Sequence, residues 1–144
     1  MKITVVCTGN TCRSPMAAAL LGSLLPEAEV SSAGIYAENG APASENAVAA
    51  MAARGVDISS HRARKLTGAD AEADMVICMT RRHKAAVKAM FPGARAYTLT
   101  ELAGEYGDVP DPYGGGPAEY ESCAGELERL TNAAAAAIKR GIYR

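Results

Sequence analysis

The chain has 144 residues, with 15 lysines and arginines against 16 aspartates and glutamates, and its length is that of one ordinary domain. The near-neutral charge argues against nucleic-acid and membrane-surface partners, and no apolar run is long enough to cross a bilayer. Because the first residues lack the pattern of a signal peptide, we expect a single cytoplasmic domain over residues 1–144.

Strand-like and helix-like segments alternate along the chain and are separated by glycines and prolines. In chain order the pattern predicts a strand at 3–6, a helix at 15–25, a strand at 29–35, a helix at 43–54, a strand at 74–80, a helix that Thr80 caps and that runs to 90, a strand at 94–99, a loop at 104–116 and a long amphipathic helix at 117–140. Such alternation is typical of a parallel sheet covered on both faces. The expected fold is therefore α/β, a three-layer α/β/α sandwich with a four-stranded parallel sheet.

The turn between the first strand and the first helix carries the strongest functional signal, Cys7-Thr8-Gly9-Asn10-Thr11-Cys12-Arg13-Ser14. Glycine and asparagine tolerate left-handed backbone angles, so this loop can point successive N–H groups inward at a helix N-terminus. The Arg13 guanidinium can grip two oxygens of an oxyanion, and these positive groups favour a thiolate at Cys7. The loop is predicted to be a phosphate cup with a nucleophile at its base. Cys7 as an inert buried residue is the less specific interpretation.

The segment from Cys7 to Ala17 resembles the active-site signature of the low-molecular-weight protein tyrosine phosphatases. Three later stretches are similar to that family and follow in its order: Ser31-Ser32-Ala33-Gly34, Ser60-His61-Arg62-Ala63-Arg64 and Asp111-Pro112-Tyr113. The resemblance implies a phosphatase that acts on phosphorylated proteins. The same resemblance implies that His61 hydrogen-bonds to the loop from behind, although a purely structural histidine is an equal interpretation.

Cysteine-dependent phosphoryl transfer needs a nucleophile, charge stabilisation and a proton donor. Cys7 is the candidate nucleophile, and Arg13 with the backbone N–H groups of residues 8–14 would stabilise the phosphoryl oxygens. Asp111, held between two prolines, is the candidate general acid, in preference to Asp108; its alternative is ordinary turn chemistry. No metal or cofactor is needed. The residues expected to bind the substrate are Thr8, Gly9, Asn10, Thr11, Cys12, Ser14 and Tyr113.

Two of these side chains have a second interpretation. Ser14 can donate a hydrogen bond to the Cys7 sulfur or simply cap the helix. Cys12 can pack beneath the loop, or it can form a disulfide with an oxidised Cys7. The family resemblance implies such reversible oxidation. Tyr36 and Tyr113 are candidates for the mouth of the pocket, with ordinary packing as the alternative.

Two departures from the commoner tyrosine-phosphatase pattern indicate the substrate. Thr11 stands where that pattern usually has a bulky aliphatic residue, and Gly114-Gly115-Gly116 follows Tyr113 where a second aromatic is frequent. A shorter polar wall suits a planar guanidino group better than a phenyl ring. The sequence therefore resembles the protein arginine phosphatase branch, and phosphoarginine is the expected substrate, with phosphotyrosine as the alternative. Neutral drift at Thr11 is the alternative explanation.

Two other classes use a similar loop. Thiol-linked arsenate reductases relay a disulfide through further cysteines, but here only Cys78 and Cys123 follow the loop, and both are expected in the core. A non-catalytic phosphate-binding module would lack the nucleophile or the acid, and both are present. A hydrolase is therefore favoured.

Overall fold

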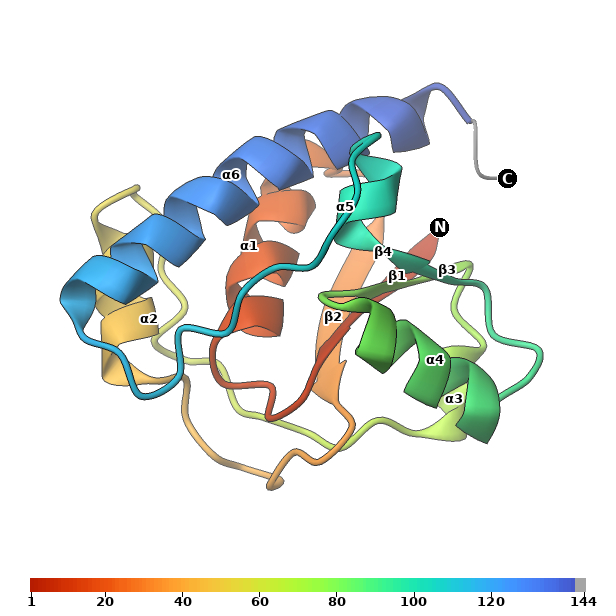
Figure 1. Cartoon of the computed structure of the whole chain (residues 1–144), viewed down its shortest axis with the longest axis horizontal. Coiled ribbons are helices and arrows are strands. Elements are labelled where there is room, and N and C mark those ends of the chain that lie inside the picture. Colours follow the sequence, from red (N-terminus) through yellow and green to blue (C-terminus); the bar gives the residue numbers. More distant parts are fainter. Residues whose placement is uncertain (142–144) are drawn as a thin grey trace.

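Residues 1–141 are described by a computed structural model, in which four strands form one parallel sheet (Figure 1). The strands are β1 (Lys2–Cys7), β2 (Glu29–Gly34), β3 (Met75–Cys78) and β4 (Ala96–Thr98), in the order β2-β1-β3-β4. β1 therefore lies inside the sheet, and Cys7 pairs with Gly34 at its carboxyl end. The predicted four-stranded parallel α/β sheet is confirmed.

Six helices accompany the sheet within the described residues. They are α1 (Arg13–Leu24), α2 (Glu45–Ala52), α3 (Gly68–Ala71), α4 (Arg81–Met90), α5 (Leu99–Leu102) and α6 (Pro117–Lys139). Figure 1 shows α1 and the long α6 on one side of the sheet and α3 and α4 on the other. These are the three layers expected from the sequence.

The strands supply apolar side chains to both faces of the sheet, as period-two alternation requires. Ile3, Val5 and Cys7 belong to the core beneath α1 and α6, whereas Val6 belongs to the smaller core beneath α3 and α4. β3 is divided in the same way between Ile77 and its neighbours. Such two-sided burial explains why β1 and β3 are nearly continuous apolar runs.

The structure corrects several element boundaries. Helix α1 begins at Arg13 with Cys12 as its N-cap, so Ser14 lies inside the first turn and does not cap the helix. Helix α2 is shorter than the expected 43–54 and is capped by the Ser44 side chain. The short helices α3 and α5 were not expected. Their four residues are too few to show a periodic pattern, and each is fixed by a capping box.

The loops that follow β1 and β3 lie together at the carboxyl ends of these neighbouring parallel strands, where the strand order reverses around β1. Open parallel sheets bind ligands beyond the carboxyl ends of their strands at such a reversal. Residues 8–12 therefore occupy the position at which a site is expected.

Within residues 1–141, no helix combines the length and apolar character needed to span a bilayer.

Candidate active site

The loop after β1 is held by an unusual backbone angle at Asn10. Its φ is 58°, and it is the one non-glycine residue with a positive φ among residues 1–141. This left-handed conformation turns the Asn10 backbone N–H toward Cys7, whose Sγ accepts its hydrogen bond at 3.3 Å. Asparagine tolerates this conformation better than most residues. The loop thus wraps around the sulfur.

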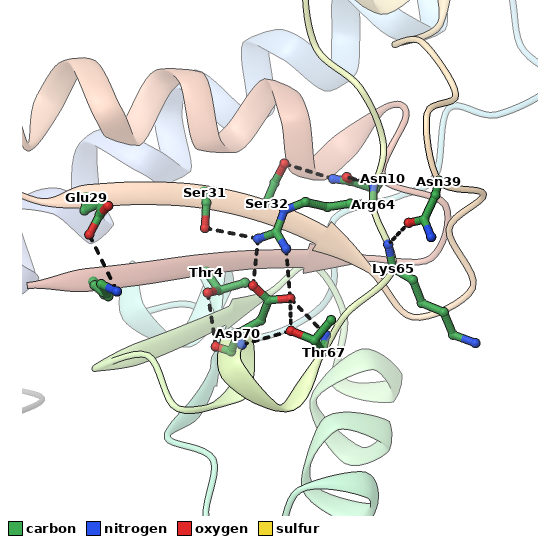
Figure 2. A network of polar contacts seen from close by, with 11 residues as sticks. Thr4, Asn10, Glu29, Ser31, Ser32, Asn39, Arg64, Lys65, Thr67 and Asp70 are labelled. Atoms are coloured by element: carbon green, nitrogen blue, oxygen red, sulfur yellow. Dashed lines mark hydrogen bonds and ion pairs between the residues drawn. The ribbon is translucent and has the colours of Figure 1, made fainter.

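The Asn10 side chain ties the loop to two other segments (Figure 2). Its Nδ2 donates to Ser32 Oγ at 2.9 Å, and its Oδ1 accepts from the Arg64 backbone N–H at 3.0 Å. The same Nδ2 also donates to Ser14 Oγ at 2.8 Å. Asn10 is fully buried, so each of these bonds replaces a lost contact with water. This network holds the backbone of the loop in place.

Ser14 is oriented toward the Cys7 sulfur. Its Oγ lies 2.9 Å from Cys7 Sγ and accepts the hydrogen bond from Asn10, which leaves the serine proton available for the sulfur. Two donors, the Ser14 hydroxyl and the Asn10 backbone N–H, then converge on Cys7. Both donors are directed at the atom that would carry negative charge if this sulfur acted as a nucleophile.

Arg13 joins the loop to the expected acid. Its side chain is buried; Nη1 donates to the Val109 carbonyl at 3.1 Å, and Nη2 lies 3.5 Å from Asp111 Oδ2. Val109 is itself held in place, because its backbone N–H donates a hydrogen bond to the carbonyl of Met79, the residue after β3. The guanidinium therefore orients the segment that carries Asp111, and it presents positive charge inside the cup.

One small cavity brings together most of the residues expected at the site. Asn10 and Ser14, which were also expected to bind the substrate, are fully buried and do not line it. The volume of the cavity is about 120 Å³, a size suited to a compact oxyanion, and half of the Asp111 side chain is exposed there. Asp108, the competing carboxylate, instead accepts the backbone N–H of Arg81. Tyr36 is exposed and does not line this cavity. The residues that line it are Cys7, Thr8, Gly9, Thr11, Cys12, Arg13, Asp111 and Tyr113.

His61 and Arg64 support the loop from the side of β2. His61 Nε2 donates to the Asn10 carbonyl at 2.7 Å. The Arg64 guanidinium forms two hydrogen bonds with Asp70, at 2.7 and 3.0 Å (Figure 2). Partial burial acts to raise the pKa of Asp70, but the bonds from Arg64 and Thr67 outweigh it and hold this pKa below its usual value. The anchored Arg64 backbone can then bind Asn10.

Cys12 lines the cavity, and its sulfur also contacts helix α6. Its Sγ is 3.2 Å from Tyr120 Oη and 3.6 Å from Ser44 Oγ. Burial raises the pKa of Tyr120, so its hydroxyl stays protonated and can donate to the Cys12 sulfur. The disulfide between Cys12 and Cys7 that the resemblance implies stays a prediction.

Gly34 provides room for the loop. A Cβ at this position would lie 2.6 Å from the Thr8 carbonyl oxygen and 3.0 Å from the Asn10 nitrogen, both backbone atoms. Such contacts force backbone to move.

Gly34→Ala is therefore expected to destabilise the protein by about 1–3 kcal/mol and to weaken phosphate binding, because the loop must shift. Denaturant unfolding and calorimetric titration with inorganic phosphate measure the two effects. Gly22→Ala in helix α1 is the matched control, because no atom lies within 4 Å of its added Cβ. That change should stabilise by up to about 1 kcal/mol. Equal behaviour of the two variants would contradict this role for Gly34.

Three contacts of the site were not expected from the sequence: Val109 with Arg13, Tyr120 with Cys12, and His83 with Thr8. Each joins residues far apart in the chain. The available signal for His83 was its position three residues after Thr80, at the start of a helix that follows a strand. Nothing in the sequence indicated the other two.

Comparison with known proteins gives one consistent result. The family model described as low molecular weight phosphotyrosine protein phosphatase matches residues 2–143. A protein-arginine-phosphatase of Geobacillus stearothermophilus is 42% identical over 134 residues, covering 90% of both chains. A probable low molecular weight protein-tyrosine-phosphatase, EpsP of Ralstonia solanacearum, is also 42% identical, covering 91% of both.

A solved structure extends this similarity to three dimensions. The YwlE arginine phosphatase, in a mutant form with a phosphorylated active-site serine, superposes with a TM-score of 0.92 at 36% identity, covering 97% of both chains. The expected enzyme class, a protein phosphatase, is thereby confirmed. The chain belongs to the low molecular weight phosphotyrosine protein phosphatase family.

Proposed function

We propose that this enzyme hydrolyses phosphoarginine in proteins, with Cys7 as the nucleophile and a phosphocysteine as the intermediate. The observation that carries the proposal is that Cys7, Arg13 and Asp111 line one cavity of phosphate size. Nucleophile, cationic clamp and carboxylate are the three groups that such a displacement needs.

In the first half-reaction, Cys7 Sγ attacks phosphorus and the bond from phosphorus to the guanidino nitrogen breaks. Arg13 and the loop's N–H groups bind the phosphoryl oxygens while charge spreads over them. Asp111 protonates the departing nitrogen. This proton is needed because guanidine is far more basic than phenolate, so that it departs poorly without one.

In the second half-reaction, water attacks the phosphocysteine and the bond from phosphorus to sulfur breaks. Asp111, now ionised, accepts the proton of this water. The sulfur leaves as a thiolate, which accepts hydrogen bonds from Ser14 and from the Asn10 backbone. Phosphate is then released and the resting enzyme is restored.

Charge around the cavity favours a cationic substrate. A groove of about 760 Å³ shares Asp111 and Tyr113 with the cup. Its acidic lining includes Asp108, Glu119 and Glu126, and no lysine or arginine of residues 1–141 lines it. A phosphorylated guanidino group carries N–H donors that such carboxylates can accept. A phenyl ring carries none.

The apolar walls are also sparse. Tyr113 is 80% exposed, and three glycines follow it in place of a second aromatic. Thr11 contributes a short polar side chain to the cavity. Phosphotyrosine remains the second candidate, because Tyr113 lies at the cavity and the EpsP relative is described as a probable tyrosine phosphatase.

An arsenate-reductase relay is disfavoured by the remaining cysteines. Cys78 belongs to the core on the opposite face of the sheet from Cys7, and burial raises its pKa to about 12. Burial also raises the pKa of Cys123 to about 11. Thiols in this state are poor nucleophiles for disulfide exchange.

Thr11→Ile should lower the ratio of kcat/KM for a phosphoarginine peptide to that for a phosphotyrosine peptide by about tenfold, because a larger apolar wall excludes the guanidino group and favours the ring. Paired kinetics on the two peptides measure the ratio. Thr11→Val is the matched control, because it removes the hydroxyl while keeping the size. If Thr11→Ile leaves the ratio unchanged, Thr11 does not select the substrate.

The remaining expectations stay predictions: a single catalytic domain over residues 1–144, a cytoplasmic location, and the absence of nucleic-acid and membrane partners. A chromogenic aryl phosphate assay tests the hydrolase against a non-catalytic phosphate-binding module. Release of the phenolate by the wild-type protein is expected, and its absence would favour the module.

A further inference from the structure

The Thr8 side chain connects the cup to helix α4. Its Oγ1 lies 2.8 Å from Nε2 of His83, which is 75 residues later in the chain. Thr8 also lines the cavity together with Cys7, Arg13 and Asp111. Thr8 therefore connects an imidazole to the cavity in which a phosphoryl group would bind.

His83 is held in a fixed position. It lies in the first turn of α4, where its backbone N–H donates to Thr80 Oγ1 at 3.1 Å, and its side chain is 8% exposed. One turn later, Val87 belongs to the core beneath this helix. The ring therefore belongs to a packed element of the fold, from which it contacts the Thr8 hydroxyl.

The second ring nitrogen identifies the tautomer. Nδ1 of His83 is buried and has no hydrogen-bond partner within the described residues. A buried N–H without an acceptor is costly and rare, whereas an unmatched acceptor is tolerated more often. The proton therefore belongs on Nε2, which donates to Thr8 Oγ1. The hydroxyl proton of Thr8 is then not used by His83.

Electrostatics keep this ring uncharged. Burial, with the Arg13 guanidinium adding to it, lowers the pKa of His83 to about 4, while the Asp111 and Asp108 carboxylates act in the opposite direction. At neutral pH the imidazole carries one proton and no charge. Its one proton is on Nε2 and forms the hydrogen bond to Thr8, so giving up this proton as an acid would break that hydrogen bond.

We propose that His83 is a positioning residue for the proposed phosphatase reaction: its Nε2–H donates to Thr8 Oγ1 and keeps the Thr8 hydroxyl proton directed to an oxygen of the bound phosphoryl group. This role rests on the proposed function, but it concerns a group outside the loop and outside the residues assigned to bond breaking. In this role His83 makes the Thr8 hydroxyl one more hydrogen-bond donor to the phosphoryl group. The orientation of that hydroxyl is set by a residue of helix α4.

The test is a double-mutant cycle with Thr8→Val and His83→Leu. Dissociation constants for inorganic phosphate are measured by calorimetry, and kcat and KM with an aryl phosphate. Each single change should weaken phosphate binding about tenfold, the value of one hydrogen bond to a charged group, and the double variant should be no weaker than the worse single one. His83→Gln, whose amide N–H can replace Nε2–H, should restore most of the affinity.

The control is Arg82→Ala, an exposed neighbour on the same helix that should change neither measurement. Nitrogen NMR of the wild-type ring should show the Nε2–H tautomer at neutral pH, and this readout does not depend on any variant folding. Additive losses in the double variant, no rescue by glutamine, or an Nδ1–H tautomer would each overturn the role of His83. A wild-type protein that binds phosphate but hydrolyses neither phosphopeptide would overturn the proposed function alone.

Discussion

Cys7→Ser should lower turnover by roughly 10⁴- to 10⁶-fold, the scale of loss when a covalent nucleophile is removed. A hydroxyl lacks the nucleophilicity of a thiolate, and a phosphoserine would not release its phosphoryl group as readily as a phosphocysteine. Binding of inorganic phosphate or vanadate should persist, because Arg13 and the loop's N–H groups remain. Steady-state kinetics and calorimetric titration measure the two properties.

The matched control is Cys78→Ser, because Cys78 is a buried cysteine in the core on the other face of the sheet and lines neither the cup nor the groove. It should retain most of the activity, which would show that the loss at Cys7 is not a general effect of removing a buried thiol. Turnover retained by Cys7→Ser would refute the assignment of the nucleophile.

Asp111→Asn should lower kcat for phosphopeptides by about 10²- to 10⁴-fold, because an amide can neither give a proton to the leaving group nor take one from water. A nitrophenyl phosphate has a leaving group that departs without a proton. With that substrate the variant should release about one equivalent of nitrophenolate rapidly and then turn over slowly, since only the second half-reaction still needs Asp111. Stopped-flow absorbance distinguishes the two phases.

Asp108→Asn is the control for this change, because Asp108 lies three residues earlier in the same loop and binds Arg81. We expect a small effect on both phases. If the two variants lose activity equally, the carboxylate of Asp111 has no special role and the acid must be sought elsewhere.

Most of the fold could be predicted from local patterns. The apolar runs of β1 and β3 and the periodicity of α6 are long enough to identify, and their alternation leads to a parallel sheet. The start of α1 could not be predicted in this way, because Cys12 forms an N-cap without any side-chain hydrogen bond. Serine is a common N-cap residue, but the Ser14 side chain forms its hydrogen bonds with Cys7 and Asn10 instead.

The site was predictable where its residues are consecutive and unpredictable where folding brings distant ones together. Residues 7–14 form the cup through their own sequence, because Asn10 can adopt the angle that the loop requires. The contacts of Val109 with Arg13 and of His83 with Thr8 depend on how loops meet at the carboxyl end of the sheet. No local sequence pattern indicates which distant residues will meet there. The ordered family motifs predicted Asp111, which its local composition alone would have assigned to a turn.

In the proposed reaction the phosphoryl group passes through the sulfur of Cys7. Rapid mixing of the Asp111→Asn variant with nitrophenyl phosphate, followed by quenching in denaturant and peptide mass spectrometry, tests this directly. We expect that during the initial phase the peptide containing Cys7 gains the mass of one phosphoryl group, located on that residue. Turnover that proceeds with no phosphoryl adduct on Cys7 at any time, or with the adduct on another residue, would contradict it.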